Sequence, residues 1–185
     1  MKKCWLVLIL LVLTACAPWV KVGGDYRAEP ENYSVTLPEG WMKSNTVTGL
    51  LVTRDGVLLQ TIRVGRFNVD QELKNTRKKY SRNMLPQEMA DVAIDNIKSD
   101  PLITNFKLLE SSPATLSGIP GSKIVYEFKT KEGQLRFKCI HYEIMSGEWI
   151  YGIWYRAAAL SKSSNRWRRA RRRRRRWSPR PGRRS

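Results

Sequence analysis

The sequence is poor in the residues that most often build catalytic and metal sites. It contains one histidine, His141, and three cysteines, Cys4, Cys16 and Cys139. A single histidine excludes a metal site built on several histidines. Cys139 is the only cysteine after residue 16, so the body of the chain has no internal disulfide. We predict no metal, no cofactor and no catalytic residues, and a fold that depends on its hydrophobic core.

An apolar run long enough to cross a membrane is also missing. The longest run extends from about Trp5 to Leu13, about half of the roughly 20 residues that a spanning helix needs. Two lysines precede it and small residues follow it. This three-part layout is typical of a secretory signal peptide, so we predict that residues 1–15 are an export signal.

The end of this segment, Leu13-Thr14-Ala15-Cys16, resembles the lipobox of bacterial lipoproteins at every position. The resemblance implies cleavage between Ala15 and Cys16 and attachment of a lipid to the Cys16 thiol, with palmitate among the acyl chains. Two or three acyl chains anchor a protein firmly to a bilayer. The alternative is an ordinary signal peptide with an incidental cysteine. Ala17 follows in place of aspartate, which by the enteric sorting rule implies the outer membrane, facing the periplasm, rather than the inner membrane.

Acidic residues are absent from the C-terminal segment. Of the 34 basic residues, 13 lie in residues 161–185 and two in the export signal, whereas all 16 acidic residues lie between. The body is therefore nearly neutral and has the usual size of a single domain. We predict that residues 159–185 are a disordered tail, since like charges repel and the segment has little to bury.

Three interpretations of the tail remain open. It could bind the anionic envelope surface, it could bind nucleic acid, or it could be an out-of-frame product of a GC-rich gene end with no function. Export makes nucleic acid the poorest of the three. The residues expected to contact an anionic surface are Arg168, Arg169, Arg171, Arg172, Arg173, Arg174, Arg175 and Arg176.

The body alternates between strand and helix signals. Residues 16–31 combine the lipidated cysteine with a Gly-Gly pair and two prolines, and we interpret them as a flexible tether. Strand signals follow over about 33–37 and on both sides of Asp55-Gly56, a common hairpin turn. Helix formers dominate residues 69–98. Four strands complete the body, and the last should be central because it is apolar on both faces.

This order carries a second resemblance. "YSVTLPEGW", "SGIPGSKIVYEF" and the aromatic last strand resemble the PsbP-like fold of photosystem extrinsic proteins and many bacterial lipoproteins. The resemblance implies that residues 32–158 form an α+β domain, an antiparallel sheet with a central helical insertion in an α/β/α sandwich. Members of that fold usually end in a helix that packs on the sheet. Here the arginine tract occupies its place, so we expect the closing helix to be missing.

Two pairs of residues could suggest chemistry. Cys139 and His141 share one face of a strand, as a thiolate pair would, but packing under a helix is the more frequent reason for such a pair. Asp91 and Asp95, four apart on a helix, are typical of a solvated face. We therefore predict a non-enzymatic binding or assembly module of the cell envelope, held at the membrane by Cys16, with an envelope protein as a possible partner. The alternatives are a protein that acts through its arginine-rich tail and an accessory enzyme whose site the sequence does not reveal.

Overall fold

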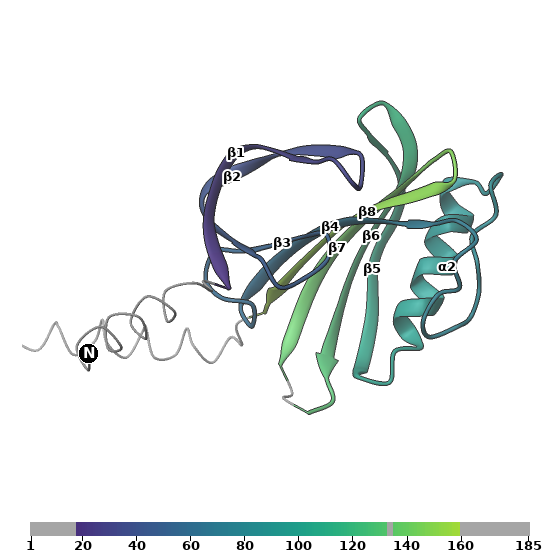
Figure 1. The fold of residues 1–185 in the computed structure, drawn as a ribbon. Helices are drawn as coiled ribbons and strands as arrows, with labels where there is room; N and C mark the ends of the chain where they lie inside the picture. The colour runs from purple at the N-terminus through teal and green to yellow at the C-terminus, as the bar shows by residue number, and fades with distance from the viewer. Residues whose placement is uncertain (1–17, 133–134, 160–185) are drawn as a thin grey trace, which may run out of the picture.

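Eight strands and one helix form the part of the chain that the computed structural model describes, residues 18–132 and 135–159. The strands are paired antiparallel throughout, in the order β1-β2-β3-β4-β8-β7-β6-β5 (Figure 1). Their bounds are β1 Trp19–Ala28, β2 Tyr33–Ser44, β3 Leu50–Thr53, β4 Gln60–Asn68, β5 Ile103–Leu116, β6 Ile119–Thr130, β7 Arg136–Ser146 and β8 Trp149–Ala158.

The last strand, β8, occupies the centre of the sheet, between β4 and β7, which confirms the position predicted from its apolar pattern. Ile150 is completely buried on the helix side, and Ile153 packs into the core on the opposite face. The hairpin predicted around Asp55-Gly56 is also present, because β3 and β4 are neighbours joined by that turn.

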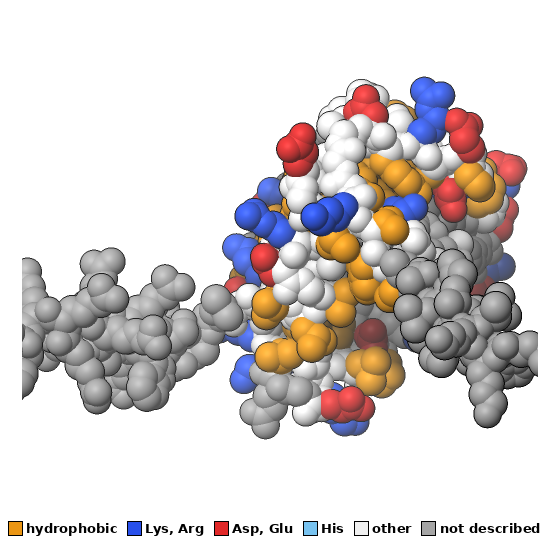
Figure 2. Space-filling view, turned by 60° about the vertical axis from the view of Figure 1, so that its left-hand side comes forward, with side chains coloured by type: hydrophobic (Ala, Val, Ile, Leu, Met, Phe, Trp, Pro, Cys, Tyr) orange, Lys and Arg blue, Asp and Glu red, His pale blue; other side chains and the backbone are white. Residues whose placement is uncertain are grey.

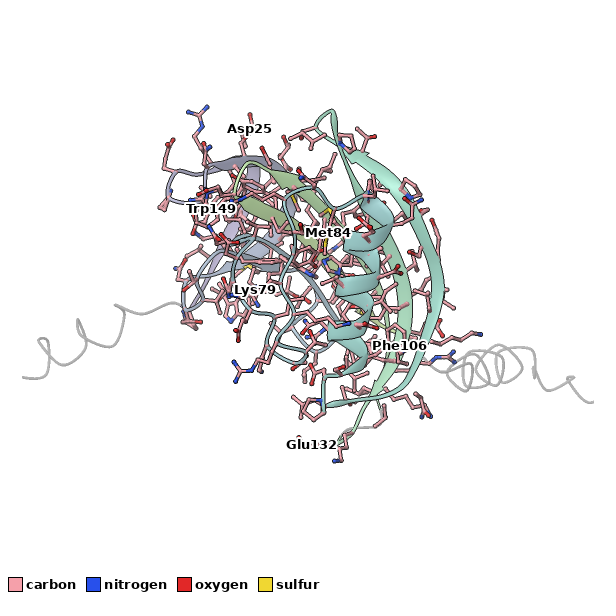
Figure 3. All side chains as sticks on the ribbon, turned by 90° about the vertical axis from the view of Figure 1, so that its right-hand side faces the viewer. Asp25, Lys79, Met84, Phe106, Glu132 and Trp149 are labelled. Atoms are coloured by element: carbon pink, nitrogen blue, oxygen red, sulfur yellow. The ribbon has the colours of Figure 1, made fainter. Side chains whose placement is uncertain are left out.

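Helix α2 (Pro86–Lys98) covers one half of one face of the sheet, where it packs on β5, β6 and β7. The buried helix residues Ala90, Ala93 and Ile94 meet aromatic side chains of β6 and β7. Glu88 marks the start of the helix, since its carboxylate accepts a 2.7 Å hydrogen bond from the backbone N–H of Leu85. The segment with Lys79 and Met84 runs on the opposite side of α2 from Phe106 in β5 (Figure 3).

The β1–β2 hairpin curls away from the plane of the other strands and arches over the face opposite α2 (Figure 1). A second core fills this arch, with Leu37 and Trp41 of β2 packed against Leu50, Val52 and Val64. The Tyr33 hydroxyl secures the tip by donating a 3.3 Å hydrogen bond to the carbonyl of Val64. Figure 2, which brings this side forward, shows hydrophobic side chains in a band with charged ones around it.

The predicted fold class was wrong. The described chain is an antiparallel sheet with one helix on one face, not an α/β/α sandwich with a central helical insertion. Residues 69–85, expected to form a first helix, make a series of turns instead, with Arg77 in the left-handed region at φ 60°. The segment turns only a few apolar side chains inward, among them Leu73 and Tyr80, which is too sparse for the continuous stripe that a packed helix needs.

The structure also differs from the predicted tether. Most of that segment, Trp19–Ala28, is the edge strand β1, paired with β2 from Trp19↔Ser44 to Ala28↔Tyr33. The glycine pair serves a bulge in place of a flexible link, because the register shifts between Val22 and Gly24 and Gly24 has a φ of 74°. The predicted export signal 1–15, the lipidated Cys16 and nearly all of the tail 159–185 lie outside the described residues.

Candidate functional site

A wide hollow lies on the helix side of the sheet, in the half that α2 leaves uncovered. It has a volume of about 560 Å³ and runs along β4, between α2 and residues 71–74 on one side and the β2–β3 loop on the other. A smaller hollow of about 270 Å³ adjoins it and extends over β8 toward Arg156. The two share Arg63, Asn96 and Trp154, so these three side chains stand at the middle of one continuous groove.

Two glycines shape the floor of this groove. Gly65 of β4 and Gly152 of β8 are direct neighbours across the strand pair. A Cβ atom at Gly152 would overlap the indole of Trp154, so glycine at this position lets the ring lie down against the strand. Trp154 is thus half-buried, with part of its indole open to the groove.

Cations without acidic partners line the groove. Arg63 is exposed next to Trp154, its cross-strand neighbour, and neither an ion pair nor a hydrogen bond of its side chain is recorded among the described residues. Lys74 is likewise exposed and unpaired within the described part of the chain. Arg156 stacks on the Phe137 ring, 4.9 Å from its centroid. Arg66 also borders the hollow, but its guanidinium stacks on Trp149 at 3.8 Å and donates a hydrogen bond to Tyr151, on the opposite face of the sheet.

The carboxylates of the groove are partly engaged elsewhere. Glu72 pairs with Arg77 at 3.4 Å, and Asp100 accepts a 2.9 Å hydrogen bond from the backbone N–H of Leu102. Glu31 is the third carboxylate of the lining. Arg63 therefore stands at the middle of the groove without an ion pair among the described residues.

A buried polar cluster lies directly behind Trp154. The His141 ring is 5.1 Å from the Trp154 ring, and its Nε2 atom is 3.0 Å from Oε1 of Glu143. The hydroxyl of Tyr80 donates a 2.7 Å hydrogen bond to the other carboxylate oxygen of Glu143. Burial, followed by the charge of Glu143, raises the pKa of Tyr80 well above its usual value, so this tyrosine stays protonated.

This cluster does not assemble hydrolytic chemistry. Ser122 lies opposite Glu143 on the next strand, but its hydroxyl has no hydrogen-bond partner among the described residues. The residues Ser122, His141 and Glu143 are each at most 3% exposed, which leaves a substrate no access to them. We interpret the cluster as a structural network that ties residues around Tyr80 to the centre of the sheet.

Cys139 and His141, the pair predicted from the sequence, lie in different surroundings. Cys139 packs against α2 in the core, as expected for a residue under a helix, and also borders the smaller hollow. Burial raises the pKa of its thiol to about 11. A nucleophilic cysteine needs a lowered pKa, so Cys139 is unsuited to thiolate chemistry at neutral pH. His141 does not border that hollow but contacts Glu143 and Trp154.

The second pair predicted from the sequence, Asp91 and Asp95, lies on α2. Asp91 is exposed on α2, and Asp95 forms a 2.7 Å ion pair with Lys78. The hydrogen bond from Lys78 lowers the pKa of Asp95. In the described residues, no group of three or more histidines, cysteines and carboxylates is arranged to hold a metal ion. The predicted sites Ala15, Cys16 and Arg168–Arg176 fall outside the described part of the chain.

A second hollow of about 400 Å³ opens on the other face, beneath the tip of the β1–β2 arch. Its lining is mainly aliphatic and aromatic, with Val35, Ile144 and Ile153 among its walls and hydroxyl groups such as that of Tyr151 at its border. The Tyr151 hydroxyl accepts a 3.4 Å hydrogen bond from Arg66. This hollow lacks the unpaired cation that distinguishes the groove on the helix side.

Comparison with solved structures identifies the architecture. The chain is similar to cyanobacterial PsbP (CyanoP) from Synechocystis sp. PCC 6803, with a TM-score of 0.50 and 10% identity over 83% of this chain and 88% of that one. The fold is PsbP-like. A Pseudomonas aeruginosa protein of unknown function also matches, with a TM-score of 0.42 and 11% identity over 90% of this chain and all of the other. No family model and no curated protein matches the sequence.

The PsbP-like similarity concerns the fold and leaves the groove to be interpreted from its own residues. Arg63 and Trp154 were missed in the sequence. Alternation in β4 does indicate that Arg63 points away from Ile62 and Val64. However, only the pairing of β4 with β8 reveals that Arg63 lies beside Trp154.

Proposed function

We propose that the protein is a lipid-anchored lipoprotein of the bacterial cell envelope whose PsbP-like domain binds a ligand or an envelope partner without catalysing a reaction. The observation that carries the proposal is the sequence Leu13-Thr14-Ala15-Cys16, which matches the lipobox at each position. By the sorting rule, the lipid on Cys16 holds the protein at the outer membrane, facing the periplasm.

The position of β1 adds a geometric consequence to this proposal. β1 begins at Trp19 and is paired from its first residue, and the carbonyl of Pro18 already accepts a 2.9 Å hydrogen bond from Asn45. Three residue steps separate Cys16 from Trp19, a reach of roughly 11 Å when extended. A lipid on Cys16 would therefore hold the folded domain against the bilayer surface. No helix among the described residues has the length and apolar character to cross a membrane.

The groove supports binding as the function of the domain. It is of the size usual for small-molecule sites, a few hundred cubic ångströms. The raised pKa of the Cys139 thiol and the enclosed Ser122–His141–Glu143 cluster argue against an accessory enzyme that uses these residues. An action through the arginine-rich tail remains a separate prediction, because Arg168–Arg176 lie outside the described residues.

Metabolic labelling with radioactive palmitate tests the anchor. We expect the wild-type protein to incorporate palmitate and Cys16→Ala to lose both the label and membrane association. The chain offers matched controls, since Cys4→Ala and Cys139→Ala should keep the label. Failure of the wild type to incorporate palmitate, or incorporation by Cys16→Ala, would overturn the proposal.

Separation of the inner and outer membranes on a sucrose gradient then tests the outer-membrane assignment.

A further inference from the structure

The half of the sheet that α2 leaves open has an unusual composition for a surface at the centre of a sheet. On the helix side, β4 presents Thr61, Arg63 and Gly65, and β8 presents Gly152, Trp154 and Arg156. Positions of this kind are commonly apolar when another helix covers them. Here they form the floor of a groove with an exposed guanidinium at its middle.

Arg63 and Trp154 are placed to act together. They are direct partners in the β4–β8 ladder, so their Cβ atoms lie about 4.5–5.5 Å apart on one face. Among the described residues the Arg63 guanidinium is neither in an ion pair nor stacked on a ring. The Trp154 indole rests against Gly152 and His141 and keeps an open part toward the groove. One side chain offers charge-assisted hydrogen bonds and the other a flat apolar surface.

The charge of the residues that line the groove indicates which kind of molecule it binds. Arg63, Lys74 and Arg156 place their cationic groups along the groove, and Arg63 at its middle has no acidic partner among the described residues. The lining carboxylate Glu72 is already paired with Arg77. The C-terminal segment of this chain carries twelve arginines, one lysine and no acidic residue after residue 160, so it has the wrong sign to fill the groove. An anionic molecule has the complementary sign.

The geometry points to a binding site for a small anionic ligand that joins a flat ring to a phosphate or carboxylate group. Its oxyanion pairs with Arg63, whose planar guanidinium matches two oxygens at once. Its ring lies on Trp154. This assignment rests on the proposed binding function and gives it a ligand class. The palmitate experiment tests the anchor separately, because neither Arg63 nor Trp154 takes part in lipidation.

The test follows the indole N–H signal of Trp154 by NMR in the full-length protein, held in phosphatidylcholine nanodiscs. The indole signal that is absent from the spectrum of Trp154→Phe is assigned to Trp154. Because this signal reports only on the surroundings of Trp154, ligand bound to distant arginines does not shift it. We expect phenyl phosphate, which combines ring and charge, to shift the signal to saturation. Inorganic phosphate has the charge without the ring, and benzyl alcohol has the ring without the charge, so both should bind more weakly than phenyl phosphate.

Substitutions of single arginines distinguish specific binding at Arg63 from non-specific electrostatic attraction to the protein surface. Arg63→Gln should weaken phenyl phosphate binding about tenfold, the effect of losing one charged hydrogen-bonding partner. Arg63→Lys should fall between it and the wild type. Arg54→Gln, an exposed arginine in the β3–β4 turn, is the matched control and should leave binding unchanged. No shift in the wild type, equal affinity in Arg63→Gln, or benzyl alcohol binding as tightly as phenyl phosphate would each overturn the assignment.

Discussion

The hydrogen bond between Tyr80 and Glu143 provides a sharp test of how the sheet is held to the segment that precedes α2. The donor and acceptor atoms are 2.7 Å apart, and Tyr80 and Glu143 are 4% and 3% exposed. Tyr80→Phe removes the hydroxyl and keeps the ring, which packs 5.6 Å from the Phe67 ring. The perturbation therefore isolates the hydrogen bond from the apolar packing.

The expected loss of unfolding free energy is about 1.5–3 kcal/mol, the value of a buried hydrogen bond to a charged group. In a urea titration with a slope of about 2 kcal/mol per molar, the midpoint should fall by roughly 1 M with the slope unchanged. Tyr142→Phe is the control, because Tyr142 is half-buried on the other face of β7 and its hydroxyl has no recorded hydrogen bond. It should change the unfolding free energy by less than about 0.5 kcal/mol.

A double-mutant cycle with Glu143→Gln completes the experiment. Removal of the Tyr80 hydroxyl should cost less when the carboxylate is already gone, because the charged acceptor gives the bond its strength. The pKa of Tyr80 is raised in the folded state, so its contribution is full below about pH 10 and is lost as the pH rises further. Loss of stability in Tyr80→Phe no greater than in Tyr142→Phe would refute the role given to this bond.

Two further predictions concern the neighbouring strands. Gly121→Ala should reduce the unfolding free energy by about 1–3 kcal/mol, since a Cβ there would overlap the carbonyl oxygen of Glu143, whereas Gly65→Ala, with no atom nearer than 4.0 Å, should cost less. Equal urea midpoints for the two would contradict the packing at β6 and β7. Burial raises the pKa of Cys139 from 9.0 to about 11, so its contribution to stability is complete below pH 9 and declines between these values. The slope of stability against pH in this window should be shallower in Cys139→Ala, and an identical slope would be evidence against the burial effect.

Local pattern predicted several elements of the fold correctly. Alternation indicated β2 around Tyr33–Leu37, the Asp55-Gly56 pair marked the β3–β4 hairpin, and the apolar face that includes Met89 and Ala93 located α2. These signals are short-range, because a strand or helix displays its period within one segment. The central position of β8 could be predicted for the same reason, since its apolar residues alternate onto both faces.

The errors arose in segments whose composition is compatible with more than one local structure. Gly23-Gly24 is compatible with a flexible tether or with a bulge in a paired strand, and pairing with β2 decides for the strand. Residues 69–85 are rich in helix formers, but few side chains turn inward and Tyr80 is drawn to Glu143, 63 residues later in the chain. Propensity is a weak guide where tertiary contacts of this kind are available.

The sequence by itself determined the features that depend on consecutive residues: the lipobox resemblance at Cys16, the nearly neutral body beside a basic tail, and the apolar periods of the body. The tertiary structure alone decided that Arg63 stands beside Trp154, that Gly152 makes room for the indole and that Tyr80, His141 and Glu143 form one buried cluster. The reason is physical. Strand register and curvature bring together side chains that are distant along the chain, and these are set by the packing of the whole sheet and not by any one segment.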